Sequence, residues 1–338
     1  MAEQITRNLG MELVRATEAA ALAAARWMGR GEKNAADGAA VEAMRYSLAA
    51  VDMDGVVVIG EGEKDEAPML FIGEQLGNGQ LPRVDIAVDP IDGTRLTALG
   101  LPGAIAVVAL APRGTLYAAP PGIFYMEKIA VGAAARDVID IRWPVATNLI
   151  NVAAAKSVGI GDLTVIVLDR PRHEQLIREI REAGARIKLI GDGDVAAAIA
   201  AATPGTGVDV LMGIGGAPEA VVSATAIKTL GGNIQCRLYP RNESERAQLE
   251  AAGVDLRRVL EMEDLVASDD VYFAATGITD GELLRGVHYI SRGATTSSIV
   301  MRGKTGTIRR IEAQHRLNKL ARLSNLSYGG KLEMVDND

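Results

Sequence analysis

Acidic side chains follow directly after two short apolar segments in the first half of this 338-residue chain. Residues 56–59 lead into Gly60-Glu61-Gly62-Glu63-Lys64-Asp65-Glu66, and residues 84–88 lead into Asp89-Pro90-Ile91-Asp92-Gly93-Thr94. Carboxylates this close together repel one another unless cations lie among them. Carboxylate and carbonyl oxygens are also the ligands that Mg²⁺ and Mn²⁺ take in proteins. If the two segment ends converge, Glu61, Asp89, Asp92 and the Ile91 carbonyl form a divalent-metal site.

Each motif also has a purely structural interpretation. The first is compatible with a solvated acidic loop. The second is a favourable turn, because Pro90 suits position i+1 and Gly93 can take a positive φ angle. Pro90 would nevertheless direct Asp89 and Asp92 into one site, and the Thr94 hydroxyl would be placed to hold a water. Two acidic strand ends that converge therefore favour the metal site over two unrelated turns.

Three loops in the second half carry residues suited to a phosphorylated ligand: 169–172, 191–194 and 213–219. Arg170 and Arg172 are cations suited to a phosphate, and Asp192 and Asp194 could accept hydrogen bonds from sugar hydroxyls. Glycines at positions 213, 215 and 216 would expose backbone N–H groups just before a helix, which is another anion site. One such loop is more often an ordinary turn. Three at the carboxyl ends of strands favour a phosphorylated, hydroxyl-rich ligand.

The pattern of apolar residues indicates how these loops are held. In the first half it predicts two helices, 8–28 and one that includes 41–51, and strands over 56–59, 84–88 and 105–110, an α+β or layered arrangement. In the second half strands (163–168, 186–190, 208–214) alternate with helices (173–183, 195–202, 218–230), which predicts a mainly parallel α/β sheet. A charged surface loop and helix is expected over 241–264, and further strands over 271–275 and 297–301. We place a domain boundary near residue 145, with a metal-binding domain over 1–145, a substrate-binding domain over 146–322 and a mobile tail over 323–338.

Composition excludes several other classes of protein. The chain has 36 basic and 43 acidic residues, and only 4% of its residues are aromatic, which argues against a nucleic-acid partner. One cysteine, Cys236, excludes a disulfide framework and a cysteine-based zinc site. No uncharged stretch is long enough to span a membrane, so we expect a cytoplasmic protein without a membrane partner. His173, His288 and His315 show no metal-ligand spacing, and we expect them to be surface or capping residues.

Taken together, these motifs resemble those of the metal-dependent, lithium-sensitive sugar and inositol phosphatase superfamily. More narrowly, the chain is similar to the class II fructose-1,6-bisphosphatases over about residues 8–320. Besides the two acidic motifs, the resemblance lies in residues 29–38, Asp169-Arg170-Pro171-Arg172-His173, Gly191-Asp192-Gly193-Asp194-Val195 and residues 213–219.

The resemblance implies a layered α-β-α-β-α fold and hydrolysis of the 1-phosphate of fructose 1,6-bisphosphate, a step of gluconeogenesis. It implies two or more Mn²⁺ or Mg²⁺ ions on Asp37, Glu61, Asp89, Asp92 and Glu219, with Lys33, Asp65 and Thr94 in catalytic positions. The implied substrate positions are Asp92, Gly93, Thr94, Tyr125, Arg170, Pro171, Arg172, Asp192, Gly193, Asp194 and Gly216. Some relatives carry Glu where this chain has Asp92, and Lys where it has Arg170. Both exchanges keep the charge.

Other functions stay open at this point. A related phosphatase could act on inositol phosphates or nucleotide 3′-phosphates, although the pair of Arg170 and Arg172 suits a second phosphate that an inositol monophosphate lacks. Activity on sedoheptulose 1,7-bisphosphate is compatible with the same residues. A phosphosugar-binding regulator without catalysis is the alternative from another class. We expect a homo-oligomer, a dimer or a tetramer.

Overall fold

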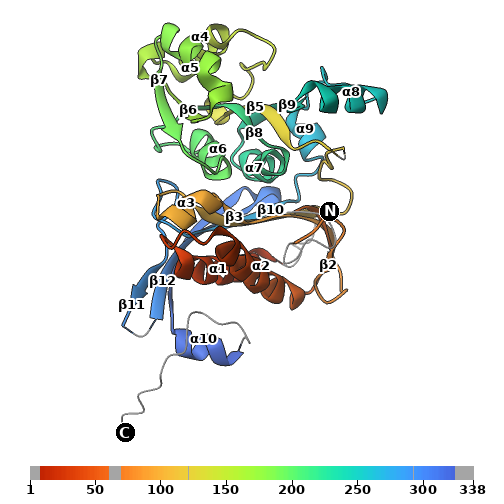
Figure 1. The fold of residues 1–338 in the computed structure, drawn as a ribbon, viewed down its shortest axis with the longest axis vertical. Coiled ribbons are helices and arrows are strands. Elements are labelled where there is room, and N and C mark those ends of the chain that lie inside the picture. The colour runs from red at the N-terminus through yellow and green to blue at the C-terminus, as the bar shows by residue number, and fades with distance from the viewer. Residues whose placement is uncertain (1–7, 61–69, 121, 292, 324–338) are drawn as a thin grey trace.

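The computed structural model describes residues 8–60, 70–120, 122–291 and 293–323. Two predicted site residues, Glu61 and Asp65, and the predicted tail from residue 324 onward lie outside the described residues. Figure 1 shows two β-sheets with helices between them and on their outer faces. The α/β fold class predicted from the sequence is therefore confirmed.

The first sheet has eight strands in the order β11-β12-β10-β4-β3-β1-β2, and β13 pairs with the free side of β12. Its strands are β1 (Asp54–Ile59), β2 (Gln75–Leu76), β3 (Arg83–Asp92), β4 (Ile105–Pro112), β10 (Tyr272–Gly277), β11 (His288–Ile290), β12 (Gly293–Arg302) and β13 (Thr307–His315). Only β1 and β3 pair in parallel. Nine of the ten residues of β3 are buried, because helices cover both faces of this central strand.

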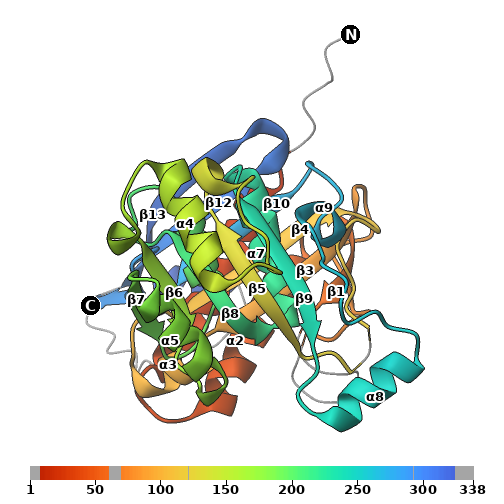
Figure 2. The ribbon, with the colours of Figure 1, turned by 90° about the horizontal axis from the view of Figure 1, so that it is seen from above.

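The second sheet has five strands in the order β7-β6-β8-β5-β9, which Figure 2 shows side by side. They are β5 (Tyr125–Val131), β6 (Thr164–Leu168), β7 (Arg186–Ile190), β8 (Val210–Gly216) and β9 (Asn233–Tyr239). The three strands predicted here, β6, β7 and β8, pair in parallel as expected. Two strands without a sequence prediction, β5 and β9, join them in antiparallel, so the sheet is mixed.

Helices form the remaining layers. α1 (Gly10–Ala24) and α2 (Lys33–Ala49) cover the outer face of the first sheet, and α4 (Val145–Lys156) and α5 (Glu174–Glu182) cover the outer face of the second. α6 (Val195–Ala202) and α7 (Ala217–Thr229) lie between the sheets, where small alanine side chains let both sheets approach closely. The short helices are α3 (Thr94–Leu99), α8 (Glu243–Ala251), α9 (Met262–Leu265) and α10 (Leu317–Leu323). No helix among the described residues is both long enough and apolar enough to cross a membrane.

The chain crosses between the sheets more than once. β5 precedes residue 145 yet belongs to the second sheet, and β10 to β13 follow the second sheet yet belong to the first. The expected boundary near residue 145 therefore does not coincide with the division between the sheets. Strand pairing of this kind connects residues far apart in the chain, and apolar periodicity gives no signal for it.

Candidate active site

The two sheets meet at the carboxyl end of β3. Asp92, the last residue of β3, is 2% exposed, and its Oδ2 accepts hydrogen bonds from the backbone N–H groups of Val195 (3.1 Å) and Ala196 (3.4 Å) at the start of α6. Burial raises the pKa of Asp92 well above its usual value, and the charges of Asp194 and Glu219 raise it further. The end of a first-sheet strand is thus joined to a second-sheet helix among several acidic groups.

Asp89 lies three residues earlier, as the motif predicts. It is 8% exposed, and its Oδ1 accepts a hydrogen bond of 3.0 Å from the Ile91 backbone N–H. This local bond spans Pro90 and orients the Asp89 carboxylate. The sequence predicts that the strand ends in a turn here, but β3 continues to Asp92, and its register against β4 shifts between Asp89 and Asp92. The two aspartates therefore flank a buried irregularity of the strand.

Thr94 links the end of β3 to α2. Gly93 takes the left-handed conformation that the turn requires, with φ of 95°, and Thr94 begins α3 directly afterwards. The Thr94 hydroxyl donates to Asp37 Oδ1 at 2.9 Å and lies 3.3 Å from the Ile91 carbonyl oxygen. Burial raises the pKa of Asp37, and the Thr94 hydroxyl and the charge of Lys33 oppose that shift. Three predicted positions, Lys33, Asp37 and Thr94, are therefore neighbours.

A buried lysine that is not predicted from the sequence, Lys128, lies beside the carboxylates of Asp194 and Glu219. Lys128 on β5 is 3% exposed, and its Nζ lies 2.7 Å from Oδ2 of Asp194, itself 5% exposed. Burial acts to lower the pKa of Lys128, but the charges of Asp194 and Glu219 outweigh it, so the pKa is raised and the amine stays protonated. The signal available in the sequence was a single lysine among the apolar residues of 126–131.

Glycines 215 and 216 leave the space in which these carboxylates lie. A Cβ atom on Gly215 would lie 1.8 Å from Asp194 Oδ2, and one on Gly216 would lie 1.8 Å from Glu219 Oε2. The sequence predicts that these glycines form an anion site with their backbone N–H groups, and that role stays a prediction. The space they leave for the two acidic side chains is a reason for glycine that the sequence did not indicate.

Glu219 fits the role of a cation ligand. Its Oε2 is buried and has no hydrogen-bond partner in the described part of the chain. Burial raises the pKa of Glu219, Lys128 opposes the shift, and Asp194 adds to it. A buried carboxylate oxygen without a partner is costly, and a divalent cation would satisfy it. Among the residues that the structure describes, no three His, Cys, Asp or Glu side chains lie close enough to hold a metal by themselves. Glu61 of the expected ligand set is not among these residues.

Replacement of Gly216 by Ala is expected to displace the Glu219 carboxylate, because the added Cβ would overlap its Oε2. The metal concentration that gives half-maximal activity should rise at least about tenfold. A titration of chelator-treated enzyme with Mn²⁺ measures it. Gly161→Ala is the matched control, since a Cβ there meets only an ordinary contact at 3.7 Å. An unchanged midpoint in Gly216→Ala would contradict the placement of Glu219.

Apart from Asp92, Gly93 and Thr94, the predicted substrate residues lie on the second-sheet side of the site. The Arg170 guanidinium donates to Asp192 Oδ1 (3.0 Å) and to the Gly191 carbonyl (2.6 Å). The Asp192 Oδ2 also accepts from the Arg95 backbone N–H at 3.3 Å, which links the loop to α3. A Cβ on Gly193 would lie 3.2 Å from both Asp92 oxygens. The loop 191–194 therefore packs directly against the end of β3.

Arg172 and Tyr125 form the other end of this group. The Arg172 guanidinium donates to the Ile214 carbonyl and lies 4.9 Å from the centre of the Tyr125 ring. Tyr125 is paired with Gly216 across β5 and β8, and Pro171 begins the short 3-10 turn that carries Arg172. Tyr125 and Gly216 thus lie at the ends of two paired strands, close to the turn that carries Arg172.

Of the two places expected for His173, at the surface or at a helix cap, the first is wrong. His173 stands at the N-cap position of α5, but it is 1% exposed, and its ring contacts the backbone of two strands. The sequence pattern placed it at the start of a helix, where a capping role is usual, and could not show that the helix start is covered by β8. His288 is partly exposed and hydrogen-bonds to Asp280.

Buried carboxylates that face an arginine-bearing loop across two sheets are typical of the metal-dependent hydrolases of phosphate esters. Residues 7–315 match the family described as bacterial fructose-1,6-bisphosphatase, glpX-encoded, and the chain belongs to this family. It is 47% identical to the fructose-1,6-bisphosphatase class 2 of Haemophilus influenzae, over 95% of this chain and all of that protein. It is 49% identical to the fructose-1,6-bisphosphatase 1 class 2 of Escherichia coli K12, over 93% of this chain and 96% of that protein.

Proposed function

We propose that the chain hydrolyses the 1-phosphate of fructose 1,6-bisphosphate to fructose 6-phosphate and inorganic phosphate. Membership of the family supports this reaction. The observation that carries the site is the junction at Asp92, where a buried carboxylate on one sheet meets the helix and acidic loop of the other. Substrate held by second-sheet loops would there face the carboxylates of Asp89 and Asp92 on β3.

The metal ligands in this proposal are Asp37, Glu61, Asp89, Asp92 and Glu219, for two or more Mg²⁺ or Mn²⁺ ions. When bound, these ions would neutralise the phosphoryl oxygens, lower the pKa of the attacking water and stabilise the leaving alkoxide. The unpartnered Oε2 of Glu219 and the raised pKa values of Asp92 and Glu219 support the assignment, because a cation would relieve the repulsion among these groups.

Thr94, Asp65 and Lys33 act on the reacting phosphate. The Thr94 hydroxyl is fixed by Asp37 and the Ile91 carbonyl, so it can orient the attacking water. Asp65 would accept the proton of that water, directly or through the hydroxyl. Lys33 begins α2 one turn before Asp37 and would add positive charge beside the transferring group.

Arg170, Arg172 and Tyr125 hold the sugar and the phosphate that is not cleaved, together with Asp192, Gly193, Asp194 and Gly216. Binding energy at this distant end would position the 1-phosphate for reaction. A second phosphate also explains two arginines on one loop, and this favours a sugar bisphosphate over an inositol monophosphate.

Thr94→Val is expected to lower kcat about a hundredfold or more, because valine keeps the shape of the side chain and removes the hydroxyl that donates to Asp37. Thr94→Ser restores a hydroxyl and should retain most of kcat. Steady-state phosphate release measures both variants. If Thr94→Val were as active as Thr94→Ser, the hydroxyl would have no part in the reaction.

The substrate is tested by release of inorganic phosphate from fructose 1,6-bisphosphate, sedoheptulose 1,7-bisphosphate and inositol 1-phosphate, each with Mn²⁺, with Mg²⁺ and with EDTA. We expect metal-dependent release from fructose 1,6-bisphosphate, well above inositol 1-phosphate. Phosphate release from sedoheptulose 1,7-bisphosphate decides whether both sugar bisphosphates are substrates. If no phosphate were released from any of the three compounds, a phosphosugar-binding regulator would be favoured instead.

We also propose that the protein is a cytoplasmic homo-oligomer, a dimer or a tetramer. The single cysteine, Cys236, is free and buried, which suits a reducing compartment. Light scattering coupled to size-exclusion chromatography gives the oligomeric state.

A further inference from the structure

The parallel strands β6 and β8 part before they reach the site. They pair at Val165 with Val210 and at Ile166 with Leu211. Beyond these residues the two strands, both within the described part of the chain, are not paired. The ring of His173 lies in the space that opens between the strand ends. Its Nδ1 is 2.7 Å from the Leu168 carbonyl oxygen on β6, and its Nε2 is 2.7 Å from the Ile214 backbone nitrogen on β8.

These two contacts specify one form of the imidazole. The Leu168 carbonyl can only accept, so Nδ1 must carry the proton. The Ile214 N–H can only donate, so Nε2 must be an accepting lone pair. The ring is therefore neutral, which agrees with the lowering of the His173 pKa by burial and by the neighbouring charges of Arg172 and Arg170. The imidazole thus bridges two backbones that have no direct hydrogen bond at this point.

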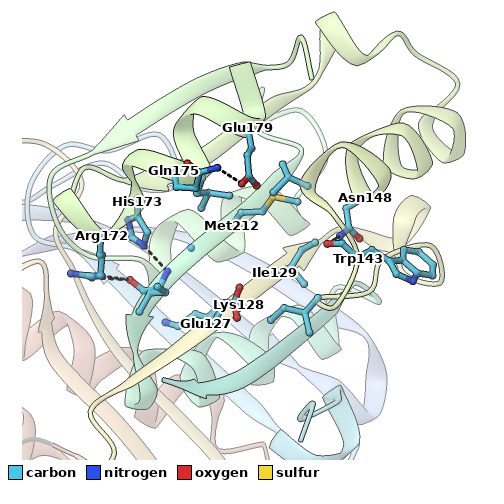
Figure 3. Close-up of a pocket in the computed structure, with 15 residues that line it drawn as sticks. Glu127, Lys128, Ile129, Trp143, Asn148, Arg172, His173, Gln175, Glu179 and Met212 are labelled. Atoms are coloured by element: carbon cyan, nitrogen blue, oxygen red, sulfur yellow. Dashed lines mark hydrogen bonds between the residues drawn. The ribbon is translucent and has the colours of Figure 1, made fainter. Parts of the chain in front are cut away.

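The backbone of the same β8 residue, Ile214, is also held by Arg172, at the peptide group that follows. The Ile214 carbonyl accepts from Arg172 Nε at 3.1 Å and from Nη2 at 2.7 Å, and Figure 3 shows the bonds from Arg172 and His173 side by side. Two consecutive residues of one turn therefore fix Ile214 at its N–H and at its C=O. Gly213 has φ of 139°, and a Cβ there would lie 3.0 Å from His173 Nε2, so glycine at this position lets the ring approach.

We propose that His173 is a positioning residue, which holds the end of β8 so that the Arg172 guanidinium is fixed beside Tyr125 for the uncleaved phosphate. The inference rests on the proposed role of Arg172 in substrate binding. His173 does not touch the substrate in this account. It acts through the backbone of Ile214, so its loss should weaken substrate binding and leave the chemical step nearly unchanged.

The test is a double-mutant cycle of His173→Phe and Arg172→Ala, read as KM and kcat for fructose 1,6-bisphosphate. Phenylalanine fills the space of the ring and removes both hydrogen bonds. We expect His173→Phe to raise KM about ten- to a hundredfold with little change in kcat, because misplacement of a binding group by about 1 Å can cost that much. The double variant should have a KM close to that of Arg172→Ala alone, because both substitutions remove the same interaction.

Two further variants keep the test decisive. His173→Gln offers one donor and one acceptor, so it should recover part of the lost binding, and it replaces His173→Phe in the cycle if the phenylalanine variant does not fold. His315→Phe is the matched control, because His315 also hydrogen-bonds in a partly buried place but contacts Thr296 on β12. Its KM should be that of the parent chain.

The outcomes separate the inference from the function on which it rests. A raised KM in Arg172→Ala together with an additive effect of His173→Phe would show that His173 does not act through Arg172, and would overturn the inference alone. An unchanged KM in Arg172→Ala would overturn the substrate role of Arg172 and the inference with it. An unchanged KM in His173→Phe would overturn the inference directly.

Discussion

Asp89→Asn is expected to reduce phosphate release from fructose 1,6-bisphosphate at least about a hundredfold, because the loss of a metal ligand removes several kcal/mol of charge stabilisation in the transition state. The fold should survive, since the asparagine side-chain oxygen can still accept the hydrogen bond from the Ile91 backbone N–H. The measurement is kcat at saturating Mn²⁺, together with the Mn²⁺ affinity of the purified variant.

Asp137→Asn is the control for this substitution. Asp137 is exposed and pairs only with the exposed Arg136 in the described structure, so its kcat should be unchanged. A kcat for Asp89→Asn within about twofold of the parent enzyme, where several kcal/mol of stabilisation is expected to be lost, would remove Asp89 from the metal site.

Lys128→Met is expected to destabilise the protein by about 3–5 kcal/mol, because it leaves the buried Asp194 carboxylate without its partner. Lys128 also offsets the charge of Glu219, and Asp194 and Glu219 in turn raise the pKa of Asp92, so the loss affects the whole site. Urea unfolding followed by circular dichroism measures the free energy. The metal should offset part of this loss, so the difference should be largest after chelation.

The double variant Lys128→Met with Asp194→Asn tests the cause. It removes both charges, so much of the stability should return, while activity should stay low because Asp194 is lost. Lys156→Met is the matched control, since Lys156 pairs with Asp209 near the surface and should cost less than about 1 kcal/mol. Equal losses of stability in Lys128→Met and Lys156→Met would show that the buried ion pair contributes no more to stability than the pair near the surface.

The strand ends that carry the chemistry could be predicted from the sequence, and the contacts between them could not. Apolar runs that end in Asp89 or in Asp169 place these residues at strand ends, because buried strands of an α/β sheet are continuous hydrophobic segments. That Asp92 would accept hydrogen bonds from Val195 and Ala196 depends on how two sheets pack, and this lies outside any local pattern.

Lys128 and His173 are two residues whose positions in the site could not be predicted from a single sequence. β5 was not predicted, and so the lysine within it had no place in the site. Its pairing with β8 and β9 joins residues from 79 positions apart (Val131 with Val210) to 114 positions apart (Tyr125 with Tyr239). His173 follows Arg172 in a turn, and only the separation of β6 from β8 makes room for its ring in the interior.

The most direct measurement of the central claim is Mn²⁺ binding to chelator-treated protein by isothermal titration calorimetry, with phosphate release from fructose 1,6-bisphosphate followed on the same samples. The account predicts at least two Mn²⁺ ions per chain, activity that returns in step with their binding, and loss of both binding and activity in Asp89→Asn. Full activity in protein that binds no divalent metal, or normal metal binding in Asp89→Asn, would contradict it.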